Sequence, residues 1–305
     1  MLSLFLFGPV SASELVNRLN PTFSRINTTQ ALSQSTVNVI FQDSTGIIWV
    51  GTIEGLNSYD GEKFEQFFSS SAANSLSNDY VSAIIEDADG VLWIGTDNGL
   101  NAFDGVRSIF SQVDLDESES GFAADHSSIR SLFIDKQSRL WVGTGRGMAR
   151  RAVNGSFIHY HHSPDDPETL GKGGVRAIAE DSQGNIWIGT DSSGLSRLNP
   201  ETGAIDRFER EFSDSGLKDN SIRDLMVDRN GTLWVATFNG GLWRVETKSL
   251  AFEYIPLVSR EGLVTSRVRS LLNDSANRIW AGTDEGLFLV DTESETSSNF
   301  AHQPT

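Results

Sequence analysis

Short apolar segments alternate with polar turns along the chain, and the clearest set lies between residues 80 and 104. Tyr80–Asp87 and Val91–Thr96 are mostly apolar, and the Ala88–Gly90 segment between them has the composition of a tight turn. Gly99–Asp104 follows after a short loop. Apolar runs of this length favour β-strands, and the 3.6-residue period of helices is absent. We predict three antiparallel strands here, the first of them buried on both faces.

This unit occurs six times. Each copy places an Asp six residues before a Trp, and a β-branched residue six residues before the Asp. The β-branched residues are Val37, Val81, Ile129, Val175, Ile222 and Val268; the Asp residues are Asp43, Asp87, Asp135, Asp181, Asp228 and Asp274. The tryptophans are Trp49, Trp93, Trp141, Trp187, Trp234 and Trp280, at intervals of 44 to 48 residues. A fourth strand, typified by Lys63–Phe68 and Gly155–Tyr160, follows the third in each unit.

Four short antiparallel strands repeated every ~45 residues are typical of a β-propeller blade. We therefore predict an all-β fold with six visible blades, in which the repeated Asp and Trp have structural roles. The turn between the first two strands needs a residue with positive φ at its end. Gly46, Gly90, Gly184, Gly231 and Asn277 occupy that position. Ser138 stands there in the third unit, so we expect strain or a different turn.

The chain divides into three parts. Residues 1–12 resemble a clipped signal peptide, because an apolar run is followed by the small-x-small sequence Val10-Ser11-Ala12. Residues 13–31 contain an outer strand near Phe23 and a lead-in. Residues 32–305 form the propeller, with units starting near 32, 76, 125, 170, 217 and 263. The sequence contains six sets of the first three strands but seven candidates for the outermost strand. This surplus predicts a seven-bladed wheel whose last blade continues beyond Thr305. The alternative is a six-bladed wheel with a surplus terminal strand.

Composition narrows the functional classes. The formal charge is −17, from 24 Lys and Arg against 41 Asp and Glu. Such a surface disfavours nucleic acid and anionic lipid as partners. The chain has no cysteine, which excludes a thiol nucleophile, a thiolate zinc site and a disulfide. After the leader, no segment reaches the ~18 apolar residues of a membrane span.

The repeated motif resembles the two-component regulator propeller repeat. Ile84, Gly90, Leu92 and Ile94 carry the resemblance in the second unit, and Tyr160–Leu170 resembles the family's inter-blade loop. The resemblance implies a non-enzymatic periplasmic sensor for a small molecule or oligosaccharide, without a cofactor. It also implies a membrane-anchored full-length receptor, homodimeric through regions outside these residues, with a histidine kinase or diguanylate cyclase as output. No kinase, cyclase or nucleotide-binding motif occurs within the 305 residues.

The residue after each β-branched marker is the candidate for ligand contact. In a propeller, the loops that enter the first strands lie at one mouth of the central channel. The six residues are Asn38, Ser82, Arg130, Arg176, Arg223 and Arg269. Four arginines at equivalent positions in an acidic chain suggest a site for an anionic ligand. Alternatively, each Arg pairs with a carboxylate or carbonyl of a neighbouring blade.

Other chemistry has weaker support. We interpret the cluster of His159, His161 and His162 as part of a solvated outer strand edge rather than a metal site. We interpret the acidic run Asp114–Glu119 as a solvated loop. A free-standing propeller enzyme resembling the streptogramin lyases needs a general base, for which only His126 is well placed. A protein-docking propeller is the third alternative. No metal-binding or hydrolase motif is present.

Overall fold

The computed structural model describes residues 32–105, 109–115, 128–208, 216–259, 261–291 and 296–300. Its regular elements are strands, arranged as six four-stranded antiparallel sheets and one two-stranded sheet. The leader, the strand near Phe23 and His126 lie outside the described residues. Within the described ranges there is no helix of the length and hydropathy that a membrane crossing requires.

Each four-stranded sheet is one blade, and its strands follow one another in sequence order. Blade 1 consists of β1 (Val37–Gln42), β2 (Ile48–Thr52), β3 (Gly55–Tyr59) and β4 (Phe64–Phe67). Blade 2 consists of β5 (Val81–Glu86), β6 (Leu92–Thr96), β7 (Gly99–Asp104) and β8 (Ile109–Val113). Blade 3 consists of β9 (Ile129–Ile134), β10 (Leu140–Thr144), β11 (Gly147–Arg151) and β12 (Phe157–His161).

The second half of the chain repeats this arrangement. Blade 4 consists of β13 (Val175–Glu180), β14 (Ile186–Thr190), β15 (Leu195–Leu198) and β16 (Ile205–Phe208). Blade 5 consists of β17 (Ile222–Val227), β18 (Thr232–Thr237), β19 (Leu242–Glu246) and β20 (Ala251–Ile255). Blade 6 consists of β23 (Val268–Asn273), β24 (Ile279–Thr283), β25 (Gly286–Asp291) and β26 (Thr296–Phe300). The small hairpin of β21 (Leu257–Val258) and β22 (Val264–Thr265) joins blades 5 and 6. The predicted all-β propeller of four-stranded blades is confirmed.

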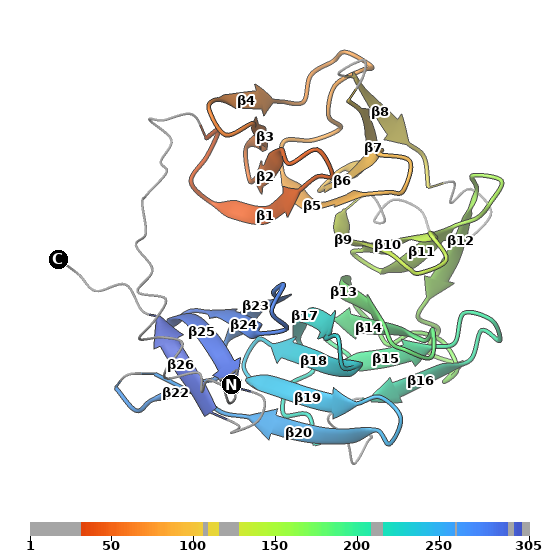
Figure 1. Cartoon of the computed structure of the whole chain (residues 1–305). Coiled ribbons are helices and arrows are strands. Elements are labelled where there is room, and N and C mark those ends of the chain that lie inside the picture. The colour runs from red at the N-terminus through yellow and green to blue at the C-terminus, as the bar shows by residue number, and fades with distance from the viewer. Residues whose placement is uncertain are drawn as a thin grey trace, which may run out of the picture.

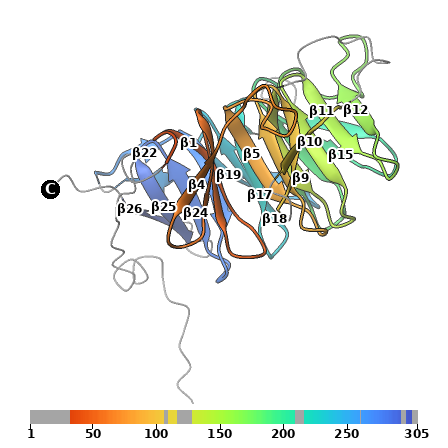
Figure 2. The same ribbon diagram turned by 90° about the horizontal axis from the view of Figure 1, so that it is seen from above.

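The blades stand side by side around a central opening, with the first strand of each blade innermost (Figures 1 and 2). Consecutive innermost strands pack against each other, from β1 and β5 through to β17 and β23. The tryptophan of one blade joins a hydrophobic cluster with residues of the next. Trp187 of blade 4, for example, clusters with Ile222 and Leu225 of blade 5 and is fully buried.

A glycine in each of four blades makes this packing close. A Cβ atom built on Gly189 would lie only 2.4 Å from Cγ2 of Ile222 in the next blade. Gly51 and Gly95 meet Val81 and Ile129 in the same way. In blade 5 the equivalent residue is Ala236, which is fully buried. The second strand therefore leaves room for the β-branched residue that begins the following blade.

The turn between the first two strands has one form in every blade. Gly46, Gly90, Gly184, Gly231 and Asn277 all have positive φ, as predicted. Ser138 also has positive φ, at 60°, and its N–H donates to Asp135 O at 2.8 Å, like the N–H of Gly46 to Asp43 O. The expected strain is present, because a non-glycine residue occupies the left-handed region. The alternative of a different turn is wrong.

The first strands are not equally buried. β13 is buried at five of its six positions and half-buried at the sixth, whereas Val37 and Ile40 of β1 are 39% and 67% exposed. Leu272 of β23 is 61% exposed. The prediction that first strands are buried on both faces is therefore wrong for blades 1 and 6. Figure 1 shows the reason: these two blades flank the gap in the ring, so within the described residues each has a neighbouring blade on one side only.

Candidate functional site

Each first strand begins with a β-bulge that involves one extra residue. In blade 4, Val175 pairs with Thr190 and Ala177 pairs with Gly189, so Arg176 between them has no partner across the ladder. The same shift occurs in the other five blades. A bulge bends its strand and redirects one side chain. The skipped residues are Asn38, Ser82, Arg130, Arg176, Arg223 and Arg269.

These six residues, which the sequence comparison had selected, all line one cavity of about 680 Å³ at the inner ends of the blades. Repeat symmetry thus brings the equivalent positions together, as expected from a propeller. Their side chains nevertheless have different partners.

Asn38 and Ser82 connect neighbouring blades. The Asn38 side-chain amide donates to the Val81 carbonyl oxygen at 2.9 Å. The Ser82 hydroxyl lies 2.6 Å from the Ile129 carbonyl oxygen and 3.1 Å from that of Gly95. Both side chains are thus hydrogen-bonded to backbone carbonyl groups, one of them in the next blade in each case.

Arg269 has an acidic partner. Its guanidinium forms an ion pair with Asp284, which also lies 3.5 Å from Arg267. The hydrogen bond to Asp284 raises the pKa of Arg269 above its usual value. Arg269 therefore pairs with a carboxylate, which was the alternative to ligand binding. The carboxylate comes from the same blade and not from a neighbouring one.

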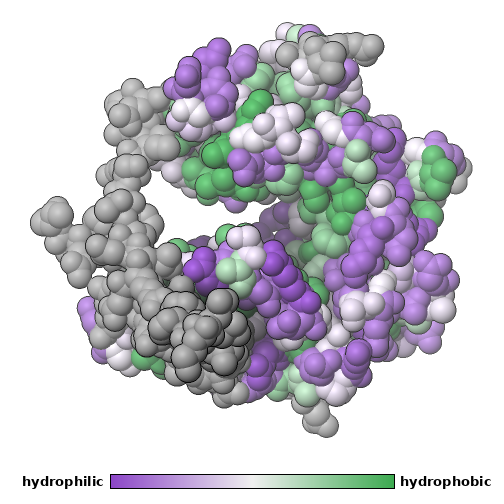
Figure 3. Space-filling model, viewed as in Figure 1, coloured by the Kyte–Doolittle hydropathy of each residue, from purple (hydrophilic) through white to green (hydrophobic). Residues whose placement is uncertain are grey.

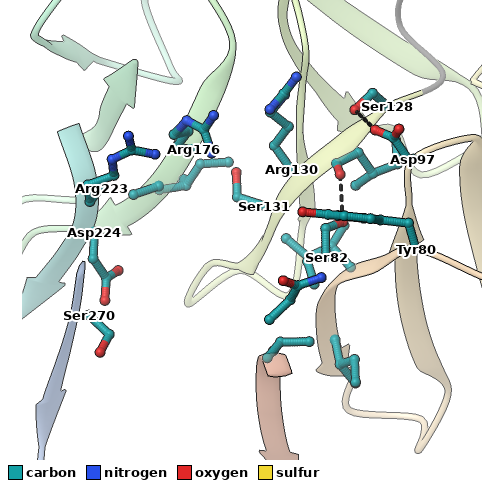
Figure 4. Close-up of a pocket in the computed structure, with 18 of the residues that line it drawn as sticks. Tyr80, Ser82, Asp97, Ser128, Arg130, Ser131, Arg176, Arg223, Asp224 and Ser270 are labelled. Carbon is teal, nitrogen blue, oxygen red and sulfur yellow. Dashed lines mark hydrogen bonds between the residues drawn. The ribbon is translucent and has the colours of Figure 1, made fainter. Parts of the chain in front are cut away.

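Arg130, Arg176 and Arg223 belong to three consecutive blades, and we call them the arginine cluster. Each has a buried Nε atom without a hydrogen-bond partner among the described residues. Figure 4 shows Arg223, Arg176 and Arg130 in a row along one side of the cavity, with Tyr80 across from them. Among the described residues, Asp191 Oδ2 lies 3.9 Å from Arg176 Nε.

The electrostatics of the cluster are unfavourable in the free protein. Burial, followed by the charges of Arg130 and Arg223, lowers the pKa of Arg176, and Asp191 only partly opposes this effect. The Arg223 guanidinium also lies 4.3 Å from the centre of the Phe238 ring, which holds it by a cation–π contact. Three guanidinium groups are therefore held near each other with incomplete neutralisation. Such a cluster can bind an anion through several charge-assisted hydrogen bonds.

Several lining residues were not selected from the sequence. Tyr80 precedes a β-branched marker and is 42% exposed. Ser128 holds the same position in blade 3, and its hydroxyl donates to Asp97 at 2.6 Å. Asp224 lies two residues after a marker, where the other blades carry Val, Ala or Ser. A comparison between repeats would have revealed them at two positions: the residue just before each β-branched marker, and the residue two positions after it.

Asp224 is half-buried in the cavity wall and accepts two backbone hydrogen bonds. Leu225 N donates to it at 2.8 Å, and Leu271 N of the next blade donates at 2.7 Å. Burial outweighs these bonds and raises the pKa of Asp224 to about 6. The cavity therefore contains a carboxyl group whose charge changes near neutral pH.

His159, His161 and His162 lie away from the cavity, on and just after outer strand β12. His159 Nε2 lies 2.9 Å from the Leu115 carbonyl oxygen, and His162 Nδ1 lies 2.9 Å from that of Leu170. The rings of His159 and His161 stack at 5.6 Å. Among the described residues there is no group of three His, Cys, Asp or Glu residues that could hold a metal ion. Of the acidic run, only Asp114 and Leu115 are described.

The repeated Asp and Trp have the same contacts in all six blades. The indole N–H of each Trp donates to the Asp six residues earlier, at 2.7–3.0 Å. The same Asp accepts backbone N–H groups of its turn, as Asp181 does from Gln183 and Asn185. These residues stabilise the blades and lie outside the cavity lining.

The comparison with known proteins agrees with the repeat structure. The family model described as two component regulator propeller matches residues 31–54, 75–98, 124–146, 169–192, 216–239 and 262–285. A curated histidine kinase of Formosa agariphila, Histidine kinase P4, is 40% identical over 63 residues, which are 21% of this chain and 5% of that protein. The chain thus spans a small part of this relative.

Solved structures share the fold. The extracellular domain of a putative hybrid two component system from B. thetaiotaomicron superposes with a TM-score of 0.77 and 24% identity, covering 92% of this chain and 37% of that one. Virginiamycin B lyase from Staphylococcus aureus superposes with a TM-score of 0.65 and 13% identity, covering 88% and 85% of the two chains. At these identities the likeness concerns the fold. The six matches to the family model, one in each blade, show that the chain belongs to the two-component regulator propeller family.

Proposed function

We propose that this propeller is a non-enzymatic, ligand-sensing module of an extracytoplasmic signal-transduction receptor, and that its ligand is an anion bound by the arginine cluster. The observation that carries the proposal is a set of three buried Nε atoms, on Arg130, Arg176 and Arg223, at one cavity; none of them has a hydrogen-bond partner among the described residues. Buried polar groups in proteins are nearly always hydrogen-bonded. Three exceptions at equivalent positions support a ligand that completes their hydrogen bonding.

The chemistry of the cluster favours a carboxylate or sulfate group on a small molecule or oligosaccharide. Guanidinium groups bind such planar or multidentate oxygens through paired hydrogen bonds. A bound anion would also offset the two effects that lower the pKa of Arg176, namely burial and the charges of Arg130 and Arg223. The chain as a whole carries a charge of −17, which disfavours large polyanions. A small acidic ligand that enters the cavity fits both properties.

The signalling role has separate support. Family membership and the likeness to an extracellular domain of a hybrid two component system favour a periplasmic sensor. The similarity to a curated histidine kinase favours a kinase output in a longer receptor, and a diguanylate cyclase remains the alternative output. We propose that this receptor is anchored in the inner membrane and dimerises through regions outside the propeller.

The binding proposal can be tested with galacturonate and inorganic sulfate as probes, by calorimetric titration. We expect binding to the wild type, and a loss of at least about tenfold in affinity in the double variant Arg176→Ala/Arg223→Ala. Arg197→Ala/Arg244→Ala is the matched control, because it removes the same charge from arginines paired with Asp206 and Glu253. Neutral galactose should bind more weakly than galacturonate. Unchanged affinity in the cluster variant would rule out the site.

A lyase function has less support. The fold resembles that of virginiamycin B lyase, but a lyase requires a general base at the cavity. The described lining of the cavity provides the carboxyl groups of Asp97 and Asp224 and no histidine. A protein-docking function is the other alternative, and a neutral macromolecular ligand whose binding survives loss of the cluster would favour it.

A further inference from the structure

A second cavity lies at the opposite ends of the three innermost strands that carry the arginine cluster. Its volume is about 440 Å³, which is within the range of small-molecule sites. Most of its lining is apolar, and these residues come from β9, β13 and β17: Phe133, Ile134, Ile178, Leu225, Met226 and Val227. Figure 3 shows that hydrophobic surface also borders the central opening. The cavity therefore gives an apolar ligand a surface against which to be buried.

One charged side chain interrupts this apolar lining. Glu180 is the last residue of β13, whereas β9 and β17 end in Ile134 and Val227. Glu180 is only 7% exposed. Its Oε2 accepts the Lys136 N–H at 2.8 Å, but its Oε1 is buried and has no hydrogen-bond partner among the described residues. Because an unsatisfied buried acceptor is costly, a ligand donor that reaches this oxygen would contribute to binding.

The equivalent carboxylate of blade 2 has the partner that Glu180 lacks. Glu86 ends β5 and is half-buried. Ser44 of blade 1 donates to both of its oxygens, through the backbone N–H at 2.6 Å and through the hydroxyl at 2.8 Å. In blade 3 the residue directly after the repeated Asp is Lys136 instead of a serine. Lys136 supplies the same backbone N–H to Glu180 but has no hydroxyl for the second oxygen.

Lys136 also lines the cavity, and its ammonium group is held by the backbone. Its Nζ donates to the Asp181 carbonyl oxygen at 2.8 Å. The lysine therefore leaves Glu180 Oε1 without a hydrogen bond, although both residues line the same cavity. The terminal torsion of a glutamate side chain is broad, so a small rotation can turn Oε1 toward a donor inside the cavity.

We propose that this cavity is a second ligand site, separate from the arginine cluster, for a small organic cation: a protonated amine on an apolar body. The ammonium group donates to Glu180 Oε1, and the apolar body packs against Phe133, Met226 and Val227. A hydrogen bond between two charged groups is among the stronger ones in proteins, and the formal charge of −17 favours the approach of cations. The flexible Met226 side chain adapts to the shape of the ligand.

Benzylammonium is the probe for this site, and benzyl alcohol is its neutral isostere. Binding is read from the Met226 methyl resonance in protein labelled with carbon-13 at its methionine methyl groups. Met148 is 1% exposed and lies outside the cavity lining, so its resonance is the internal reference. We expect benzylammonium to shift the Met226 resonance saturably at millimolar concentrations, and benzyl alcohol to bind at least about tenfold more weakly. Absence of a saturable shift, or equal affinity for the two probes, would overturn the proposal.

Glu180→Gln tests the carboxylate directly. It keeps an acceptor for the Lys136 N–H and removes the charge, so the affinity for benzylammonium should fall at least about tenfold. Glu86→Gln is the matched control, because it makes the same change at the equivalent carboxylate, where Ser44 already donates to both oxygens. This control should bind benzylammonium like the wild type. Unchanged affinity in Glu180→Gln, or equal losses in the two variants, would contradict the assigned site.

Two further variants separate this site from its surroundings. Lys136→Leu keeps the backbone N–H and removes a neighbouring positive charge, so it should raise the affinity for benzylammonium; a fall would overturn the proposal. Ile178 lines both cavities, so the variant Arg176→Ala/Arg223→Ala tests their independence. It should lose galacturonate binding and keep the Met226 response to benzylammonium. Loss of that response would overturn the proposal of a separate site, whereas retained galacturonate binding would contradict only the function proposed for the arginine cluster.

Discussion

Trp187 donates its indole N–H to Asp181 Oδ2 at 2.9 Å, and both side chains are fully excluded from solvent. Asp181 Oδ1 accepts the N–H groups of Gln183 and Asn185, at 2.8 and 3.0 Å. One carboxylate thus ties the turn between β13 and β14 to the tryptophan that packs against blade 5. This relationship explains why Asp and Trp recur at a constant separation of six residues.

Replacing Asp181 should therefore be costly. We expect Asp181→Ala to lower the free energy of unfolding by about 3–5 kcal/mol, because it leaves buried N–H donors without an acceptor. Urea denaturation measures this directly. Asp60→Ala is the control, since Asp60 also accepts two backbone N–H groups in a turn but is exposed. Equal losses in the two variants would show that burial of the carboxylate is unimportant.

Substitutions in the turn between the first two strands of a blade should change stability in opposite directions. Ser138 has a φ of 60°, and Gly184 occupies the same turn position in blade 4 with a φ of 82°. Ser138→Gly should raise stability by up to about 1 kcal/mol, because glycine adopts positive φ without steric strain although it loses more backbone entropy. Gly184→Ser should lower stability by a similar amount. Changes of the same sign, measured by thermal denaturation, would contradict this explanation.

The arginine cluster should affect stability and binding in opposite directions. Without ligand, Arg176→Ala should leave the urea midpoint unchanged or raise it, because the variant removes a guanidinium that Arg130 and Arg223 repel. Arg207→Ala is the matched control. The Arg207 guanidinium donates to the Thr169 carbonyl oxygen at 2.6 Å and to that of Asp166 at 3.2 Å, so its loss should cost about 1–2 kcal/mol. Destabilisation of Arg176→Ala beyond that control would indicate a structural role.

Asp224 predicts a pH dependence with a defined sign. Its pKa is about 6 in the fold, above the usual 3.8, so the folded protein binds this proton more tightly than the unfolded chain does. The stabilisation is complete below about pH 4 and is lost as pH rises through 6, by about 1–3 kcal/mol. Asp224→Ser, which introduces the residue found at positions 131 and 270, should flatten the stability curve between pH 4 and 7.

The affinity for an anionic ligand should also depend on the ionisation of Asp224. Deprotonation of Asp224 adds a negative charge to the cavity, so the affinity for sulfate should fall as pH rises through 6 in the wild type. The fall should disappear in Asp224→Ser. Sulfate suits this measurement because its own charge is constant over the range. An equal fall in both proteins would assign the effect to other groups.

The repeat allowed the blades to be predicted closely. The six Asp, Trp and β-branched positions recur at fixed separations, and each separation corresponds to a turn or a strand of the observed length. The third strand at Gly99–Asp104 was predicted at its observed bounds, and the first and second were within one residue. Local chemistry decides these features, because turn glycines and short apolar runs act within a single blade.

The candidate site was predicted only in part. Repeat symmetry indicated that the residues after the β-branched markers would meet, and all six line one cavity. The sequence by itself could not distinguish Arg269, which pairs with Asp284, from Arg176, whose Nε has no hydrogen bond to any described residue. The bulge that redirects each of these residues was also not predicted, since it depends on the register between two strands.

The sequence therefore determined the family, the blade and the positions that share one mouth of the channel, because each follows from spacing within a repeat. Within the described part of the chain, the tertiary structure decided which arginines have an Nε atom without a hydrogen bond and which blade faces have no neighbouring blade. Both depend on what stands next to an otherwise equivalent residue: Asp284 neutralises Arg269, and the tryptophan of the preceding blade covers Ile84 but not Ile40. Equivalent sequence positions acquire different properties through their neighbours, and those neighbours come from distant parts of the chain.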